Sequence, residues 1–323
     1  MSAILVVRPS SLGDVVWALA IAHDVKRARP DVAVDWVVEE AFAALPMLCA
    51  DVRHAVPVAL RRWRHEPFAR TTWRQLREFR TALRAERYDA VLDLQEQVKG
   101  GVLSRLARGT RHGFDRASIR EPIATWFDDV HHRVPRELHF AARVRAIAGA
   151  ALGYAVDGRP RWRWNVPPPP AALPPRPFVV AVHATSRDDK RWPAESWRAL
   201  LADVAASGLD VMLPHGTPAE EAMSRALAAR VEGAVVPPRL PLHAMAAVLA
   251  RAHVVVGVDT GLTHLAAALG TPTLALFTST DATRAGVAIA GPHARDLGGA
   301  GAIPSVDDAR SALGERLRAA PRC

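Results

Sequence analysis

The first candidate catalytic residue is Asp14, which ends a polar run beginning at Arg8. This run follows the apolar segment 4–7 directly and precedes a helical pattern that starts at Val15. A carboxylate at such a turn can take the proton from an attacking hydroxyl, and general-base catalysis commonly contributes about 10² to 10⁴ in rate. The position also suits helix capping by Ser11 or Asp14, which the spacing alone favours. Both interpretations stay open at this point.

A second candidate site is the segment 254–264, VVVGVDTGLTH, in which a buried-strand pattern leads through a turn of small residues into a helix. Free amides at a helix N-terminus carry roughly half a positive elementary charge, so a diphosphate can bind there. Thr260 and His264 are four residues apart and would share one helical face. The alternative is an ordinary capped helix with a core or surface histidine. The segment lacks the GxGxxG and GxxxxGK[ST] patterns, which argues against NAD binding and P-loop chemistry.

A third candidate is the loop 183–193, HATSRDDKRWP, which follows another apolar run. Its hydroxyls and cations suit a phosphate, and Lys190 is the cation that we expect to follow charge developing on a leaving diphosphate. The alternative is a solvated loop in which Asp188 and Asp189 neutralise Lys190 and Arg191. Glu220, near the start of a later helical pattern, could accept ribose hydroxyls, although a solvated helix start is the commoner explanation.

Positive charge is concentrated in arginines. The chain has 42 Lys+Arg against 33 Asp+Glu, a formal net charge of +9, and only three lysines. Such a chain favours anionic partners, among them nucleic acid, phospholipid surfaces and phosphorylated substrates. No nucleic-acid-binding module is recognisable, so we expect no nucleic acid partner. The densest cluster of arginines comprises Arg61, Arg62, Arg64, Arg70, Arg74, Arg77 and Arg80.

Metal and redox cofactors are not expected. His112, His131 and His132 lack metal-ligand spacing with nearby acids or cysteines. The two cysteines, Cys49 and Cys323, lie far apart, so neither a disulfide framework nor a cysteine cluster is indicated.

The elements that position these residues follow a βα rhythm, which predicts an α/β fold with parallel sheets. The rhythm covers segments 4–7, 15–28, 32–38 and 90–94, and it restarts with 178–182, 197–206, 211–213, 242–250, 254–258, 264–269 and 273–277. Residues 167–177, between the two halves, are rich in proline. Because proline is excluded from helix interiors and central strands, we predict that this segment is an interdomain linker. We therefore predict an N-terminal Rossmann-like domain over 1–166 and a C-terminal one over 167–323, with the ligand site in the cleft between them.

Two further expectations concern the chain as a whole. No stretch approaches the roughly 18 to 20 apolar residues of a membrane helix, and the N-terminus does not read as a signal peptide, so a cytoplasmic protein is expected. Segment 306–317 predicts an amphipathic helix, but the sequence does not show which domain it packs on.

Six segments of the chain form one ordered set of motifs: VVRPSSLGDVVWALA, DWVVEEAF, RRWR, HGFDRASIREP, HATSRDDKRWP and VVGVDTGLTHLAAALGTPT. Together they resemble the ADP-heptose:lipopolysaccharide heptosyltransferase family, and the match extends from the first strand to beyond Phe277. The resemblance implies a GT-B architecture, ADP-heptose as donor substrate, and the Kdo residue of Kdo2-lipid A as acceptor. It also implies peripheral contact with the anionic cytoplasmic face of the inner membrane.

The same resemblance implies roles residue by residue. Asp14 falls on the proposed general base of an inverting, metal-independent transfer. The residues implied in donor binding are Thr185, Ser186, Lys190, Glu220, Asp259, Thr260, Gly261 and His264. Those implied at the acceptor are Ser10, Ser11, Gly13, Arg61, Arg62, Arg64 and Arg120. Ser186 and His65 depart from the family pattern, where threonine and lysine are expected.

Two alternatives remain at the level of sequence. One is an enzyme of the same family acting on another acceptor, such as a heptosylated core. The other is a non-catalytic nucleotide-sugar-binding protein, which would need no base at Asp14.

Overall fold

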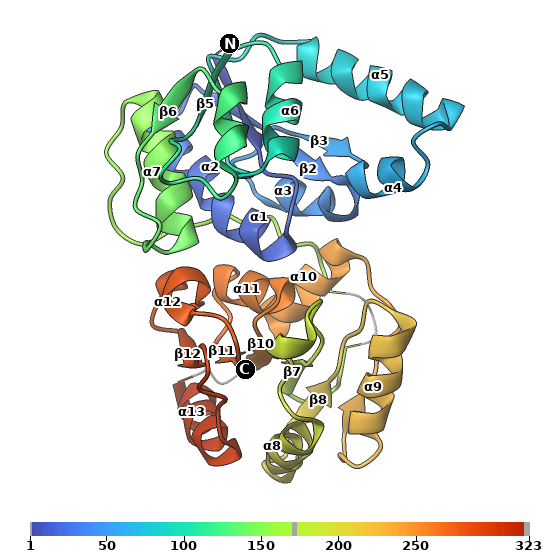
Figure 1. Ribbon diagram of the computed structural model, residues 1–323. Coiled ribbons are helices and arrows are strands. Elements are labelled where there is room, and N and C mark those ends of the chain that lie inside the picture. Colours follow the sequence, from blue (N-terminus) through green and yellow to red (C-terminus); the bar gives the residue numbers. More distant parts are fainter. Residues whose placement is uncertain (1, 170–172, 320–323) are drawn as a thin grey trace. The chain divides into compact units, whose positions relative to one another are not determined.

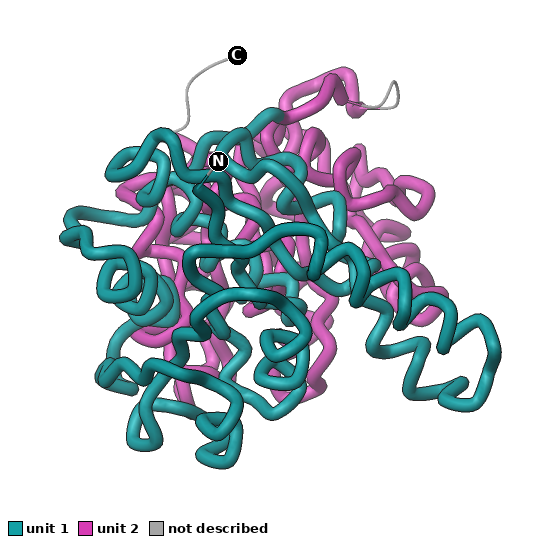
Figure 2. Tube along the Cα trace, turned by 90° about the horizontal axis from the view of Figure 1, so that it is seen from above, with its two compact units in different colours: residues 1–165 teal, residues 166–323 magenta. Residues whose placement is uncertain are grey.

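The chain divides into two compact units, Met1–Asn165 and Val166–Cys323 (Figure 2). The computed structural model describes residues 2–169 and 173–319 (Figure 1). In the proline-rich segment the described residues, 167–169 and 173–177, form neither helix nor strand, as the prolines predict. Residues 170–172 of the predicted linker and Cys323 lie outside the described residues.

Unit 1 contains one six-stranded, fully parallel sheet. Its strand order is β3-β2-β1-β4-β5-β6. The strands are β1 (Ala3–Val7), β2 (Ala33–Glu39), β3 (His54–Val58), β4 (Ala90–Asp93), β5 (Thr110–Phe114) and β6 (Val130–His132). The helices are α1 (Leu12–Ala18), α2 (Ala20–Ala28), α3 (Ala44–Leu48), α4 (Leu60–His65), α5 (Arg70–Arg84), α6 (Val98–Leu106) and α7 (Phe140–Leu152), with the 3₁₀ helices η1 (Glu40–Phe42) and η2 (Pro122–Phe127).

Unit 2 repeats this plan with a second six-stranded parallel sheet, in the order β12-β11-β10-β7-β8-β9. The strands are β7 (Phe178–Val182), β8 (Asp210–Met212), β9 (Ala234–Val235), β10 (Val254–Val258), β11 (Thr273–Phe277) and β12 (Ala294–Gly298). The helices are α8 (Ala194–Ala206), α9 (Pro218–Ala228), α10 (Leu242–Arg251), α11 (Gly261–Ala268), α12 (Ala282–Ala285) and α13 (Val306–Ala319), with η3 (Asp188–Lys190) and η4 (Ala288–Ala290).

Both sheets have the Rossmann strand order, in which the first strand of the unit pairs with the second and the fourth. The order therefore reverses between β1 and β4 in unit 1 and between β7 and β10 in unit 2. Open α/β sheets bind ligands at this switch point, beyond the carboxyl ends of the strands. The topology therefore predicts that the ligand sites lie in the loops that follow these four strands.

Helices cover both faces of each sheet, which explains the near-continuous apolar sequence of the central strands. Every residue of β1, β7, β10 and β11 is buried. The amphipathic helix predicted over 306–317 is α13, and it packs on unit 2, where Ala309, Ala312 and Leu313 join the core. In the described part of the chain, no helix is both long and apolar enough to cross a membrane.

Two features differ from the pattern in the sequence. The helix predicted over 15–28 is interrupted at Leu19, whose backbone remains right-handed (φ −60°, ψ −19°), so α1 and α2 are nearly continuous. The sequence pattern does not indicate β3, β5 and β6 of unit 1 or β9 and β12 of unit 2. These strands lie toward the edges of their sheets and contain exposed or polar residues in place of a long β-branched run, as edge strands commonly do.

Gly257 in β10 is a close-packing position that yields a stability prediction. A Cβ at this position would lie 2.3 Å from Thr263 Oγ1 and 2.9 Å from Val182 Cβ. Gly257→Ala is therefore expected to lower the free energy of unfolding by about 1–3 kcal/mol, measured by urea denaturation. Gly299→Ala is the control, because a Cβ there meets nothing within 4 Å. Equal midpoints for the two variants would contradict this packing.

Candidate active site

The site in unit 1 is a pocket of about 390 Å³ at the switch point between β1 and β4. Asp14 and the serines of the polar run enter it from the loop after β1 and the start of α1. Gln95 and its neighbours enter from the loop after β4. The lining residues are Arg8, Ser10, Ser11, Asp14, Gln95, Glu96, Gln97, Lys99, Arg120, Phe140 and Arg143.

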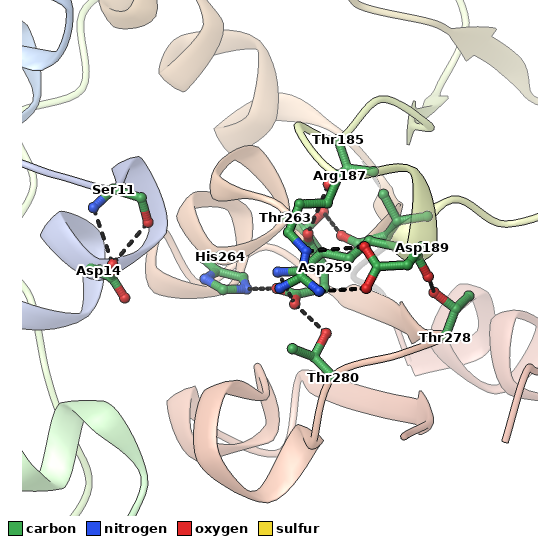
Figure 3. A network of polar contacts seen from close by, with 12 residues as sticks. Ser11, Asp14, Thr185, Arg187, Asp189, Asp259, Thr263, His264, Thr278 and Thr280 are labelled. Atoms are coloured by element: carbon green, nitrogen blue, oxygen red, sulfur yellow. Dashed lines mark hydrogen bonds and ion pairs between the residues drawn. The ribbon is translucent and has the colours of Figure 1, made fainter. Parts of the chain in front are cut away.

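Asp14 is held by three donor groups. Its Oδ2 accepts hydrogen bonds from Ser11 N (3.0 Å) and Ser11 Oγ (2.8 Å) and lies 2.5 Å from an Arg8 guanidinium nitrogen (Figure 3 shows the Ser11 contacts). Burial would raise the pKa of Asp14, but Arg8 and the bonds from Ser11 outweigh burial and lower it. Asp14 therefore both ties down the start of α1 and presents a carboxylate that is ionised at neutral pH.

Three cations besides Arg8 share this pocket. Lys99 Nζ donates to Ser10 Oγ (3.2 Å), and burial together with the charge of Arg8 lowers the pKa of Lys99. Arg143 comes from α7 and is paired with Glu96 at 2.6 Å. Arg120 completes the set. A carboxylate surrounded by cations suits an anionic molecule that presents a hydroxyl to Asp14.

Glu96 has an uncommon backbone conformation for its residue type. Its φ is +61°, in the left-handed region that non-glycine residues rarely adopt. The buried ion pair with Arg143, which also donates to Ser118 O (2.7 Å), holds Glu96 there. Strained residues of this kind cluster at functional sites, so Glu96 marks the loop after β4 as part of the site.

The predicted acceptor residues fall into two groups. Ser10, Ser11 and Arg120 line the Asp14 pocket, and Gly13 lies buried in α1 beside it. The three arginines of α4 are not among the lining residues. Arg62 instead pairs with Glu40 (2.8 Å) in a separate groove, Arg61 lies over the Phe42 ring (5.5 Å), and Arg64 is exposed.

The site in unit 2 centres on the buried carboxylate of Asp259, at the carboxyl end of β10. Lys190 Nζ donates to its Oδ2 (2.6 Å), Thr280 Oγ1 donates to the same oxygen (2.5 Å), and His264 Nε2 lies 3.1 Å from Oδ1. Figure 3 shows both His264 and Thr280 joined to Asp259 by dashed lines. Burial would raise the pKa of Asp259, but His264, Lys190 and Thr280 outweigh it and lower the pKa strongly. Lys190 therefore pairs with Asp259 and not with Asp188 or Asp189. Of the ion pairs expected for a solvated loop, the structure shows the one between Arg191 and Asp188 (2.9 Å).

The turn beside Asp259 opens α11. Thr260 is the N-cap residue, with no side-chain capping bond, and Gly261 begins the helix, which leaves the first amides free for a ligand. Thr185 Oγ1 donates to Asp259 O (3.4 Å), which joins the loop after β7 to this turn. Ser186 is exposed in the same loop. The structure thus brings Thr185, Lys190, Asp259 and His264 into one cluster.

Next to this cluster lies a pocket of about 430 Å³ whose walls include two tryptophans. Glu220 lines it, and its carboxylate accepts a hydrogen bond from Gly216 N (2.6 Å). The volume and the mixture of apolar rings with one carboxylate suit a nucleoside. The lining residues are His183, Ala184, Thr185, Arg191, Trp192, Pro193, Ala194, Trp197, Thr217, Ala219, Glu220, Met223 and Leu227.

His183 in this pocket gives a pH prediction. It is 7% exposed, its Nε2 lies 2.7 Å from Ser224 Oγ, and burial lowers its pKa from 6.5 to about 4. Between pH 6.5 and pH 4 this histidine binds a proton in the unfolded chain but not in the folded chain. The free energy of unfolding therefore falls as the pH drops from 6.5 to 4. His183→Asn should reduce this loss by up to about 3 kcal/mol, measured by urea unfolding across that range. Identical pH dependence in both proteins would contradict a neutral buried His183.

Several site residues carried no clear signal in the sequence. Gln95, Glu96 and Lys99 follow β4, and their one signal is this position after a predicted strand, because ligands bind at strand ends in open α/β sheets. Arg8 begins the polar run, but its residue type and position alone assign it no role. Arg143 and Thr280 reach their sites from α7 and from the loop after β11, which no local pattern indicates. Within residues 2–169 and 173–319, no group of three His, Cys, Asp or Glu side chains could hold a metal ion.

The sequence model of glycosyltransferase family 9 (heptosyltransferase) matches residues 76–298. The chain is 40% identical to lipopolysaccharide heptosyltransferase 1 of Escherichia coli K12 over 284 residues, which cover 86% of this chain and 88% of that relative. It is also 40% identical over 280 residues to lipopolysaccharide heptosyltransferase 1 of Pseudomonas aeruginosa, covering 86% of this chain and 79% of the relative.

Solved structures of heptosyltransferases are also similar to this chain. The structure of E. coli heptosyltransferase WaaC with ADP-2-deoxy-2-fluoro heptose superposes with a TM-score of 0.85 at 36% identity, covering 98% of this chain and 99% of that one. E. coli ADP-heptose lps heptosyltransferase II superposes with a TM-score of 0.78 at 18% identity, covering 99% of each chain, and this likeness concerns the fold alone.

Proposed function

The chain belongs to glycosyltransferase family 9, the heptosyltransferases, and from this premise we propose that it moves L-glycero-D-manno-heptose from ADP-heptose to the Kdo residue of Kdo2-lipid A. It is a glycosyltransferase of the GT-B architecture, built from two Rossmann-like units. The reaction belongs to the biosynthesis of the lipopolysaccharide inner core.

The observation that carries the proposal is the cluster of Lys190, Asp259 and His264 beside the free N-terminus of α11. It lies in a chain that is 36% identical to a structure with an ADP-heptose analogue. The amides of Thr260 and Gly261 would hold the diphosphate, and Asp259 would accept hydrogen bonds from heptose hydroxyls. Thr185 and Ser186 would add hydroxyl donors to the phosphates, and Glu220 would hold the ribose.

In the proposed mechanism, the Asp14 carboxylate removes the proton from the Kdo hydroxyl. The hydroxyl oxygen bonds to the anomeric carbon while the bond from that carbon to the ADP oxygen breaks, so the configuration inverts and ADP leaves with the electron pair. Lys190 and the α11 amides stabilise the charge that develops on ADP, a role which requires no metal ion. Asp14 is suited to its step because its lowered pKa keeps it ionised at neutral pH.

The acceptor carries carboxylates and phosphates, which the cations of unit 1 can bind. Arg120, Ser10 and Ser11 would hold the Kdo carboxylate beside Asp14, in the loop that Gly13 shapes, and Arg61, Arg62 and Arg64 would bind outlying anionic groups. Because the acceptor's acyl chains stay in the bilayer, the enzyme would work attached peripherally to the cytoplasmic face of the inner membrane.

A competition between Kdo2-lipid A and its monoheptosylated form tests the acceptor assignment. With ADP-heptose limiting, the product from Kdo2-lipid A should dominate, as measured by mass spectrometry of the extracted lipids. Preferential modification of the heptosylated lipid would assign this chain to another step of the same family.

A further inference from the structure

Residues 60–84 form an arm, α4 followed by a short loop and α5, that extends from the sheet of unit 1 (Figure 1). Its inner face is apolar and packed, with Trp63, Phe79 and Leu83 in the core of the unit. Its outer face carries two large aromatic side chains, Phe68 in the loop and Trp73 in the first turn of α5, which are 91% and 55% exposed. Large aromatic side chains this exposed, both within one loop and the helix turn that follows it, are candidates for contact with a partner.

The charge around these two rings indicates the kind of partner. The arm contains eight arginines and only two glutamates, Glu66 and Glu78. On α5, Arg70, Trp73, Arg77, Arg80 and Arg84 follow one another at spacings of three or four residues, so they line one exposed face of the helix. Exposed arginines attract anionic lipid headgroups, and an exposed tryptophan beside them can enter the interfacial region of the bilayer.

The position of the arm in the fold agrees with this partner. α4 begins directly after β3, at the carboxyl edge of the sheet, and the loops that carry Asp14 and Gln95 leave the same edge from β1 and β4. The start of the arm therefore lies at the edge of the sheet that holds the acceptor pocket.

We propose that the arm is a membrane anchor in which Phe68 and Trp73 enter the interface of an anionic bilayer while Arg70, Arg77, Arg80 and Arg84 contact lipid phosphates. The inference deepens the proposed function, because it names the residues that bring the enzyme to a membrane-embedded acceptor. Phe68 and Trp73 add an apolar contribution to membrane binding, so high salt alone does not release the protein from the vesicles.

Unit 1 has a second exposed apolar group that serves as a matched control. Ile123 and Trp126 of η2 are 50% and 70% exposed, but η2 itself, residues 122–127, contains no arginine or lysine. The pairs Phe68→Ala/Trp73→Ala and Ile123→Ala/Trp126→Ala thus remove similar apolar surface from the same unit. Only the first pair is expected to matter.

The experiment is sedimentation of the full chain with acceptor-free vesicles of phosphatidylglycerol and phosphatidylethanolamine. Phe68→Ala/Trp73→Ala should weaken binding by at least about tenfold, and Ile123→Ala/Trp126→Ala by less than about twofold. Arg77→Gln/Arg80→Gln should also lose about tenfold and reduce the salt dependence, unlike the charge-matched Arg230→Gln/Arg318→Gln in unit 2. Phosphatidylcholine vesicles should bind the wild type weakly.

Unchanged vesicle binding by Phe68→Ala/Trp73→Ala would overturn the proposal, and so would a larger loss from the η2 pair. Transfer to an acyl-free Kdo acceptor separates this inference from the proposed function. The arm variant should retain wild-type turnover on that acceptor, whereas absence of turnover in the wild type would refute the transferase reaction and leave the vesicle result standing.

Discussion

Replacing Asp14 with asparagine is expected to lower turnover by about 10³-fold while leaving the affinity for ADP-heptose unchanged. The amide keeps the size of the side chain and can still accept the bonds from Ser11, but it cannot take a proton from the acceptor hydroxyl. Turnover is measured as ADP release and donor affinity by calorimetry. Because the donor residues lie in unit 2, unchanged donor affinity shows that the variant keeps its donor site, and circular dichroism checks that the whole chain is folded.

Ser11→Ala is the control for this prediction. It removes the 2.8 Å bond from Ser11 Oγ but keeps the carboxylate and its contact with Arg8, so turnover should fall by less than about tenfold. If Asp14→Asn retained wild-type turnover, Asp14 would only cap α1. The non-catalytic interpretation of this position would then be correct.

Lys190→Met is expected to reduce turnover by about 10² to 10³-fold, because it removes the cation that stabilises the departing diphosphate. Asp259 keeps His264 and Thr280 as partners, and circular dichroism should show a folded protein. The loss should appear in kcat, measured at saturating ADP-heptose, because charge on the leaving group develops in the transition state.

Arg191→Ala provides the neighbouring control. Arg191 follows Lys190 directly, is exposed, and is paired with Asp188 at 2.9 Å. Because it lines the nucleoside pocket, its removal can raise KM for ADP-heptose, but kcat at saturating donor should change by less than about threefold. Equal losses from the two variants would show that the loop contributes only general positive charge. A change confined to KM in Lys190→Met would place Lys190 in ground-state binding alone.

The central strands were predictable because burial on both faces demands continuous apolar runs. The segments 178–182, 254–258 and 273–277 coincide with β7, β10 and β11 for this reason. The edge strands were not predictable, since β3 contains a proline and β6 reads Val-His-His, which resembles a loop. The order of the strands came only from the structure, although it is the order that defines the two switch points.

The position of a candidate residue at the carboxyl end of a strand was predictable where a motif directly follows a central strand, as for Asp14, Lys190 and Asp259, whose roles stay predictions. It was not predictable where the partner arrives from a distant element, as Arg143 does from α7 to pair with Glu96. The grouping of the α4 arginines with the acceptor residues also came from resemblance alone. In the structure they lie outside the Asp14 pocket, so their part in acceptor binding stays a prediction.

The most direct measurement is the mass of Kdo2-lipid A after incubation with ADP-heptose and the purified wild-type protein. We expect a gain of one heptose per lipid, with one ADP released for each heptose transferred. Donor binding without any gain in lipid mass, on Kdo2-lipid A or on heptosylated acceptors, would contradict it.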